Sequence, residues 1–281
     1  MAGLLNIDRE RLAHAATLET DRQLVRYICG PLAPLLPRLP TQPERIAPFV
    51  QRAGPEAIAA GFADGGLYGW HILTDLLLGR NWERSPFHAD RRFESILDAP
   101  GLRQEVRIVL AMNAVIDARQ ALEEALPGMI DAALVPLSLH PEVLTPKDTW
   151  LAFEQIASLR GLRWFEIESL FETYEAGFRK AHGLPPIERR KLSGYDRMGY
   201  ESMGIPLPLP YDDIQFSPFQ TVCFNAALLL ELLYGPSRHE NPLLEGLTRL
   251  AADTSHLGVL QYQLKQFLLS HRKALTEDLN G

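Results

Sequence analysis

The sequence predicts an all-α fold, an irregular multi-helix bundle of about ten helices with one long ordered loop. Apolar residues recur at steps of three and four along most of the 281 residues, whereas the alternation typical of strands is nearly absent. Apolar residues make up 46% of the chain and charged residues 22%, a composition that is typical of a globular protein and excludes a disordered one. We expect a single helical domain over residues 1–281, whose only candidate seams are residues 31–43 and 194–218.

The first predicted helices lie in the N-terminal third of the chain. A helix is expected from Asp8 to Cys29, where apolar side chains fall at helical spacing before a Gly-Pro pair. An extended Pro-rich connector follows over residues 34–43. A second helical region is expected from near Pro55, and a third helical segment, residues 71–78, is predicted to end at a glycine.

The longest predicted helix runs from Leu102 to Leu126. Gly101 precedes it, and Pro127-Gly128 is a strong stop signal. The apolar positions of this helix fall on more than one side, which favours a central place in the bundle.

One face of this long helix carries a polar series, Asn113, Asp117, Gln120 and Glu124. Asn113 lies between Leu110 and Ile116, within an apolar stripe. We therefore expect a buried amide at position 113, with hydrogen-bond partners on a neighbouring helix.

Thr145 marks the clearest helix start in the sequence. Its hydroxyl suits the N-cap position, Pro146 fits the first helical position, and Asp148 places a negative charge in the first turn. A further helix is expected from about Leu162 to His182, and Ser255 is expected to cap the last helix.

Charge and hydropathy restrict the partners and the compartment. The chain has 28 Lys and Arg against 35 Asp and Glu, a net charge of −7, which argues against a nucleic-acid partner and an anionic membrane. The most apolar stretch, residues 223–234, is shorter than the roughly 20 residues of a membrane span, and no signal peptide is recognised. We expect a cytoplasmic protein without a membrane span, in which Cys29 and Cys223 are buried, reduced thiols.

The motifs of common catalytic and metal sites are missing from the sequence. There is no Glu-x-x-His, no Cys-x-x-Cys and no Gly-rich phosphate loop. A stretch around Ser202 resembles a nucleophile elbow, but Tyr200 occupies a position that requires glycine. We therefore predict no catalytic residue, no metal and no cofactor. His71 and Asp75, four residues apart on a predicted helix, are explained either by a local hydrogen bond or by an acid–base or metal role.

An aromatic seam follows the predicted helix 162–182. Its members recur at steps of three and four and are Trp164, Ile167, Phe171, Tyr174 and Phe178. The seam is either an ordinary core stripe or a groove for a partner helix or an apolar ligand. Trp164, Phe171 and Tyr174 are therefore candidate binding residues.

The segment 194–218 is the second candidate binding region. It contains three glycines and four prolines and shows no helical periodicity, so a long loop is expected. A loop of this length in a compact domain is usually a lid, a binding segment or a cover for the core, and its high apolar content argues against disorder. Tyr195, Arg197 and Tyr200 are its candidate binding residues.

Residues 65–76, Gly-Gly-Leu-Tyr-Gly-Trp-His-Ile-Leu-Thr-Asp-Leu, resemble a Gly-Gly…Met-Thr-Asp-Leu segment of an uncharacterised bacterial family of helical proteins. Arg92-Phe93-Glu94 and the long helix after it lie about where that family also has a helix. The resemblance implies a bacterial source and an all-helical fold. It implies no chemistry, and no functional residue is carried over from it.

Two functions follow from these observations. The leading hypothesis is a non-catalytic cytosolic binding protein, an adaptor or inhibitor-type partner of another protein, and the acidic charge favours a basic partner. The alternative is a helical enzyme for a small or apolar substrate, with a pocket between the helix 102–126 and the loop 194–218. His71, Asp75, Asn113 and Asp117 would supply the polar groups of that pocket. Purely structural self-association is a third hypothesis.

Overall fold

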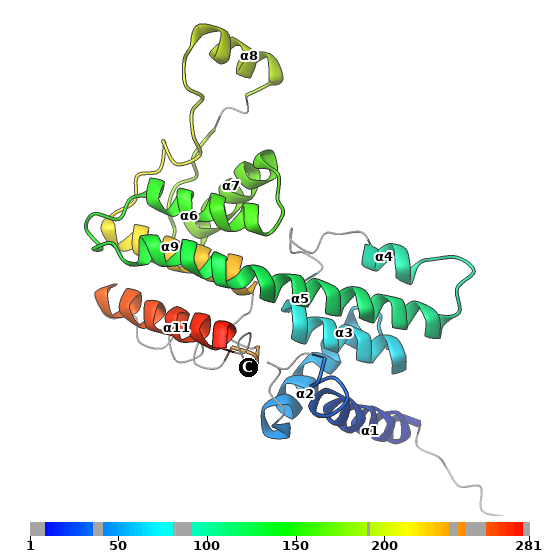
Figure 1. The fold of residues 1–281 in the computed structure, drawn as a ribbon. Coiled ribbons are helices and arrows are strands. Elements are labelled where there is room, and N and C mark those ends of the chain that lie inside the picture. The colour runs from blue at the N-terminus through cyan, green and yellow to red at the C-terminus, as the bar shows by residue number, and fades with distance from the viewer. Residues whose placement is uncertain are drawn as a thin grey trace, which may run out of the picture. The chain divides into compact units, whose positions relative to one another are not determined.

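The structure is a computed structural model that describes residues 9–35, 42–63, 65–80, 82, 92–189, 192–235, 241–244 and 257–277. Within these ranges it contains ten helices and no strand, which confirms the predicted all-α fold (Figure 1). In chain order the helices are α1 (Arg9–Cys29), α2 (Pro43–Ala59), α3 (Gly65–Leu78), α4 (Arg92–Leu97), α5 (Gln104–Leu137), α6 (Pro146–Leu159), α7 (Trp164–Ala181), α8 (Gly194–Met203), α9 (Pro218–Tyr234) and α11 (Leu257–Glu277). None of these described helices is long and apolar enough to cross a membrane.

The chain divides into two compact units. Unit 1 comprises Met1–Leu122 and Gly235–Thr248, and unit 2 comprises Glu123–Tyr234 and Arg249–Gly281. Helix α5 begins in unit 1 and ends in unit 2. The single domain expected from the sequence stays a prediction.

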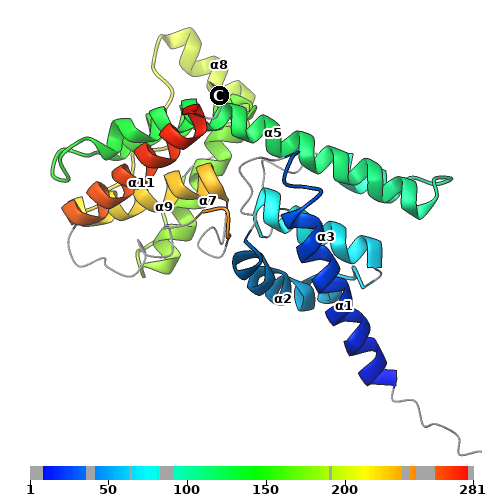
Figure 2. The ribbon, with the colours of Figure 1, turned by 60° about the horizontal axis from the view of Figure 1, so that its bottom comes forward.

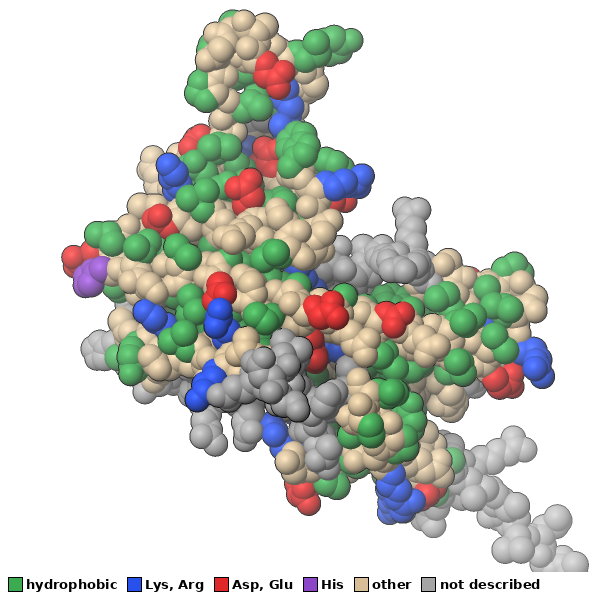
Figure 3. Space-filling model, in the orientation of Figure 1, with side chains coloured by type: hydrophobic (Ala, Val, Ile, Leu, Met, Phe, Trp, Pro, Cys, Tyr) green, Lys and Arg blue, Asp and Glu red, His purple; other side chains and the backbone are tan. Residues whose placement is uncertain are grey.

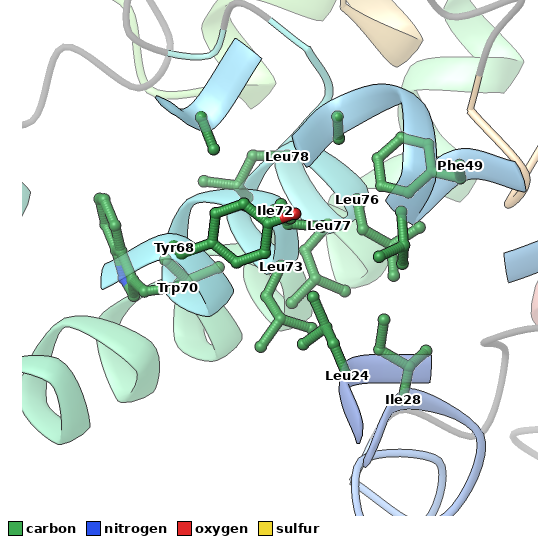
Figure 4. Packing of buried hydrophobic residues seen from close by; sticks show 14 of the residues in the cluster. Leu24, Ile28, Phe49, Tyr68, Trp70, Ile72, Leu73, Leu76, Leu77 and Leu78 are labelled. Atoms are coloured by element: carbon green, nitrogen blue, oxygen red, sulfur yellow. The ribbon is translucent and has the colours of Figure 1, made fainter. Parts of the chain in front are cut away.

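Helices α1, α2 and α3 pack against one another in unit 1 (Figure 2). Ten of the 14 residues of α3 are buried, and Figure 4 shows Leu73, Leu76 and Leu77 on the side of α3 where Leu24 and Ile28 of α1 and Phe49 of α2 lie. The hydroxyl of Tyr68 donates a hydrogen bond to Asp21 Oδ1 at 2.6 Å, which adds a polar contact between α3 and α1. Helix α3 ends at Leu78 and is followed by Gly79, which has φ +97°, a conformation that glycine adopts readily.

Helices α6, α7, α9 and α11 form the body of unit 2, in which α9 contacts the other three. The core of this unit is rich in aromatic side chains. The ring of Phe171 lies 4.9 Å from Trp150, 5.2 Å from Phe153 and 5.7 Å from Phe224, measured between ring centroids. These edge-on arrangements are favourable for aromatic pairs and position α7 against α6 and α9.

The predicted start of α6 is confirmed. Thr145 accepts a hydrogen bond from the backbone N–H of Asp148 at 3.3 Å, and the Asp148 carboxylate accepts one from the backbone N–H of Thr145 at 2.9 Å. This reciprocal capping box satisfies two N–H groups that the helix cannot bond internally.

Three predicted helix boundaries are wrong. Helix α3 begins at Gly65 rather than at position 71, so the glycines at its start do not interrupt it. Helix α2 begins at Pro43, and Pro55 lies inside it. Helix α5 continues through Pro127 to Leu137, because the turns after Pro127 bury apolar side chains such as Met129 and Ile130 completely. That burial offsets the backbone hydrogen bond that a proline removes from a helix.

Two further expectations concern residues outside those that the structure describes. Ser255, the expected cap of the last helix, lies outside the described residues, and so does most of the Pro-rich connector.

Cys29 and Cys223 form no disulfide and are half-buried rather than fully buried. Burial raises the pKa of both thiols, and the nearby Glu44 raises that of Cys29 further.

Candidate protein-binding surface

Residues 194–203 form a helix, α8, where a loop was expected. Ser193 accepts a hydrogen bond from the backbone N–H of Asp196 at 3.2 Å, and the Asp196 carboxylate accepts one from the backbone N–H of Ser193 at 2.9 Å. At the other end Gly204 has φ +63° and closes the helix in the left-handed conformation that suits glycine. Residues 204–217 are without helix, so the expected loop is right only for that part.

No residue of α8 is buried. The side chain of Tyr195 is 89% exposed, and those of Met198 and Met203 are 66% and 65% exposed. Figure 1 shows α8 standing clear of α6 and α7, and Figure 3 shows hydrophobic side chains on its outer surface. Helix α8 therefore gains little from packing and presents apolar side chains to solvent.

Arg197 links α8 to the start of α7. Its Nη2 donates to Glu168 Oε2 at 2.9 Å, and its guanidinium lies 4.9 Å from the ring centroid of Trp164. A planar guanidinium can pair with a carboxylate and stack on an aromatic ring at the same time. Arg197 thus has a positioning role for α8 in addition to being a surface residue.

The first turn of α7 exposes two adjacent aromatic rings. Trp164 is 61% exposed and Phe165 is 46% exposed, and their rings pack edge to face at 6.0 Å. Arg163 lies over the Phe165 ring at 4.5 Å and donates from Nη2 to Glu166 Oε1 at 2.9 Å. Hydrogen bonds from the side chain and backbone of Arg163 lower the pKa of Glu166 to about 2, so this pair stays charged at neutral pH. We call Trp164, Phe165, Tyr195, Met198 and Met203 the α7–α8 surface.

The chain segments that carry α8 are fastened to α7 by a buried ion-pair network. Glu175 is almost fully buried and accepts hydrogen bonds from Arg179 and, at 2.9 Å, from Arg189. Arg189 also donates to the carbonyl of Pro210 at 3.0 Å, and Arg179 donates to that of Pro185 at 3.0 Å. The segments before and after α8 therefore share one anchoring carboxylate.

The aromatic seam on α7 is divided by the fold. Trp164 belongs to the exposed surface, Phe171 is completely buried in the aromatic core, and Tyr174 is half-buried. On α8, Tyr200 is also half-buried. A fully buried ring offers no area to a partner, so Phe171 contributes to the core in this structure. Phe165 is a residue that the sequence reasoning missed, because it lies off the three–four spacing of the seam.

Of the four residues named for an enzyme pocket, His71 and Asp75 lie next to each other, and Asn113 and Asp117 do not share their buried environment. His71 and Asp75 are buried in α3, with His71 Nδ1 3.8 Å from Asp75 Oδ2, and the Phe62 ring lies 4.8 Å from the His71 ring. Asn113 and Asp117 are exposed on α5. Residues 102–122 and 194–218 belong to different units, so the pocket expected between them stays a prediction.

The expectation of a buried Asn113 is wrong. The buried positions of this part of α5 are Ala111 and Val115, whereas Val109 and Leu110 are exposed. The apolar stripe that contains Asn113 is therefore not the face that packs in unit 1. The expected central place for α5, covered on all sides, is likewise wrong for its first turns among the described residues.

Within the described ranges, no group of three or more His, Cys, Asp or Glu side chains is arranged to hold a metal ion. Comparison of the chain with protein-family models, with curated proteins and with solved structures found no match. The likeness of residues 65–76 to a bacterial family of helical proteins therefore stays an expectation.

Proposed function

We propose that this chain is a non-catalytic protein-binding module, an adaptor or inhibitor-type partner of another protein, that acts in the cytoplasm. The observation that supports the proposal is α8, a capped helix that buries none of its residues and exposes Tyr195, Met198 and Met203. Apolar side chains that folding leaves in solvent are available for contact with another protein. Exposed aromatic and methionine side chains at one place are typical of protein interfaces.

The composition of the α7–α8 surface fits this use. Tryptophan, tyrosine and arginine are the residues most enriched among those that dominate binding energy. Trp164 and Arg197 are in contact here, and the exposed Tyr195 is two residues from Arg197 on α8. The side chains of Arg197 and Trp164 are ordered before binding, since Arg197 is already held by Glu168 and by the Trp164 ring. A partner would therefore meet an ordered surface, and less side-chain entropy would be lost on binding.

The charges around this surface favour a basic partner. Arg163 and Arg197 are already paired with Glu166 and Glu168. Glu201, by contrast, is exposed and has no ion-pair partner among the described residues. Together with the net charge of −7 of the whole chain, this leaves a negative potential that steers a basic protein.

The direct test is site-specific photo-crosslinking in cells of the source organism. A photoreactive phenylalanine analogue at position 195 of the full chain is expected to give a discrete adduct with another protein. The matched control is the same analogue at position 262, because Tyr262 on α11 is also well exposed, at 63%. Adducts at both positions alike, or at neither, would overturn the proposal.

Alanine variants then measure the contribution of the surface. Tyr195→Ala combined with Met198→Ala is expected to remove the adduct partner from affinity-purified complexes, whereas Tyr262→Ala is expected to retain it. Because these side chains are exposed, each variant should change the free energy of unfolding by no more than about 0.5 kcal/mol, measured by thermal denaturation. Equal loss of the partner in both variants would contradict a role for this surface.

A further inference from the structure

A groove of about 590 Å³ lies between α1 and α2 in unit 1. Its size falls within the range of small-molecule sites. Helix α1 contributes Leu18, Arg22, Val25, Arg26 and Cys29 to its walls, and helix α2 contributes residues at steps of four along one face, Pro43, Ala47 and Gln51. The short side chains at positions 43 and 47 leave the space between the two helices unfilled.

The long walls of this groove are largely uncharged. Leu18 and Val25 on one side face Pro43 and Ala47 on the other. Burial and the negative charge of Glu44 both keep the Cys29 thiol protonated, so it adds a neutral, weakly polar surface. An apolar chain is therefore a suitable occupant of the space along α2.

The cations of the groove are gathered on α1. Arg22 and Arg26 are four residues apart, so their side chains leave the same face of the helix. Arg26 has no ion-pair partner among the described residues, and Arg22 has only an exposed contact with Glu19 at 3.5 Å. The one acidic side chain of the lining, Asp21, already accepts a hydrogen bond from Tyr68. Two guanidinium groups are thus available for an anion.

We propose that the groove between α1 and α2 binds an amphipathic carboxylate, an unbranched fatty acid whose chain lies along Pro43 and Ala47 and whose head group pairs with Arg26 and Arg22. Guanidinium groups form charge-assisted hydrogen bonds with carboxylates, often two at once. This site lies in unit 1 and is independent of the α7–α8 surface, which lies in unit 2.

The probe for this site is dodecanoate, compared with dodecyltrimethylammonium, which has the same chain and the opposite charge. Titration calorimetry on the full chain is expected to show one dodecanoate site and no site for the cation. Arg26→Gln should weaken dodecanoate binding by about tenfold or more, the loss that corresponds to one charge-assisted hydrogen bond. Arg52→Gln, which removes an exposed arginine of α2 outside the lining, should leave the affinity unchanged.

A second variant and a second readout locate the ligand. Ala47→Met fills the groove and is expected to abolish binding, with a thermal midpoint close to that of the parent protein because Ala47 is not fully buried. In a Cys223→Ser background Cys29 is the only thiol, and dodecanoate should slow its alkylation at alkaline pH.

Three results would each overturn the assignment. The first is that both amphiphiles bind equally, which would indicate unspecific apolar binding. The second is that Arg26→Gln and Arg52→Gln weaken binding to the same extent. The third is that dodecanoate fails to bind, or binds while Cys29 is alkylated at the unprotected rate.

Discussion

Helices α3 and α8 owe their helical form to different interactions. Helix α3 begins with two glycines, which have poor helix propensity, yet ten of its 14 residues are buried against neighbouring helices. Helix α8 has no fully buried residue and is bounded instead by the Ser193–Asp196 capping box and by Gly204. The first helix is therefore a product of tertiary packing, and the second is a product of local signals.

This difference bears on where each helix can change. A substitution on the buried face of α3 alters the core of unit 1, where interior packing leaves little room for relaxation. A substitution on α8 alters a surface that other residues of the chain hardly touch. Substitutions at the exposed positions of α8 are therefore expected to change the free energy of unfolding little, which suits a segment whose side chains serve binding.

The largest effect is expected from shortening a buried side chain of α3. Leu76 is completely buried, so Leu76→Ala should lower the free energy of unfolding by about 2–5 kcal/mol. Met198→Ala on α8 is the matched control and should change it by less than about 0.5 kcal/mol. Urea denaturation of both variants measures the difference. Comparable losses would show that α8 is packed more firmly than the exposure of its side chains indicates.

A stabilising effect is expected where burial is unfavourable. Asn225 of α9 is completely buried, and neither its Nδ2 nor its Oδ1 has a hydrogen-bond partner within the described residues. Asn225→Leu should therefore raise the free energy of unfolding by about 1–3 kcal/mol, because it removes the desolvation cost of an unpaired amide.

The control for this prediction is Thr221, one turn earlier on the same helix. Thr221 is also buried, but its hydroxyl donates to the Ser217 carbonyl at 3.1 Å. Thr221→Val removes a satisfied polar group and is expected to give no comparable gain in thermal midpoint. A decrease in stability for Asn225→Leu would mean that the amide is needed at this position.

The smallest effect is expected from removing the cap of α8. Ser193→Ala should cost about 1 kcal/mol of local helix stability and accelerate amide hydrogen exchange in α8, with little change in the thermal midpoint of the whole chain. Thr145→Ala removes the equivalent cap of α6, whose Trp150, Phe153 and Ile156 are buried, so there the loss should lower the thermal midpoint instead. The same response at both caps would remove the distinction between local and tertiary stabilisation.

Helix ends that depend on local residue types could be predicted from the sequence, whereas those that depend on which side chains become buried could not. The cap at Thr145 could be predicted because it depends on the residue types at three nearby positions, Thr145, Pro146 and Asp148. The same kind of signal at Ser193 was overlooked because Gly194, Gly199 and the nearby prolines favoured a loop. Pro127 is a residue that usually ends a helix. Tertiary packing overrides this local preference, because the turn after Pro127 is buried in the core.

The candidate surface depends on the same distinction. Trp164 and Phe171 occupy equivalent positions in one three–four pattern, yet the first is exposed and the second is completely buried. Periodicity identifies the face of a helix, but the length over which a neighbouring helix covers that face is set by tertiary structure. Tyr195 and Arg197 stay candidate binding residues, and the structure adds that Arg197 contacts Glu168 and Trp164 of α7 whereas Tyr195 is exposed.

The Glu175 network holds the chain on both sides of α8 independently of the exposed side chains of that helix. Both flanks of the helix are held through Arg179 and Arg189, so its exposed side chains Tyr195, Met198 and Met203 can be replaced while the flanking segments keep their contacts. Substitutions at these exposed positions would change what the surface recognises, as changes in antibody hypervariable loops do, and would leave the contacts of Glu175 in place.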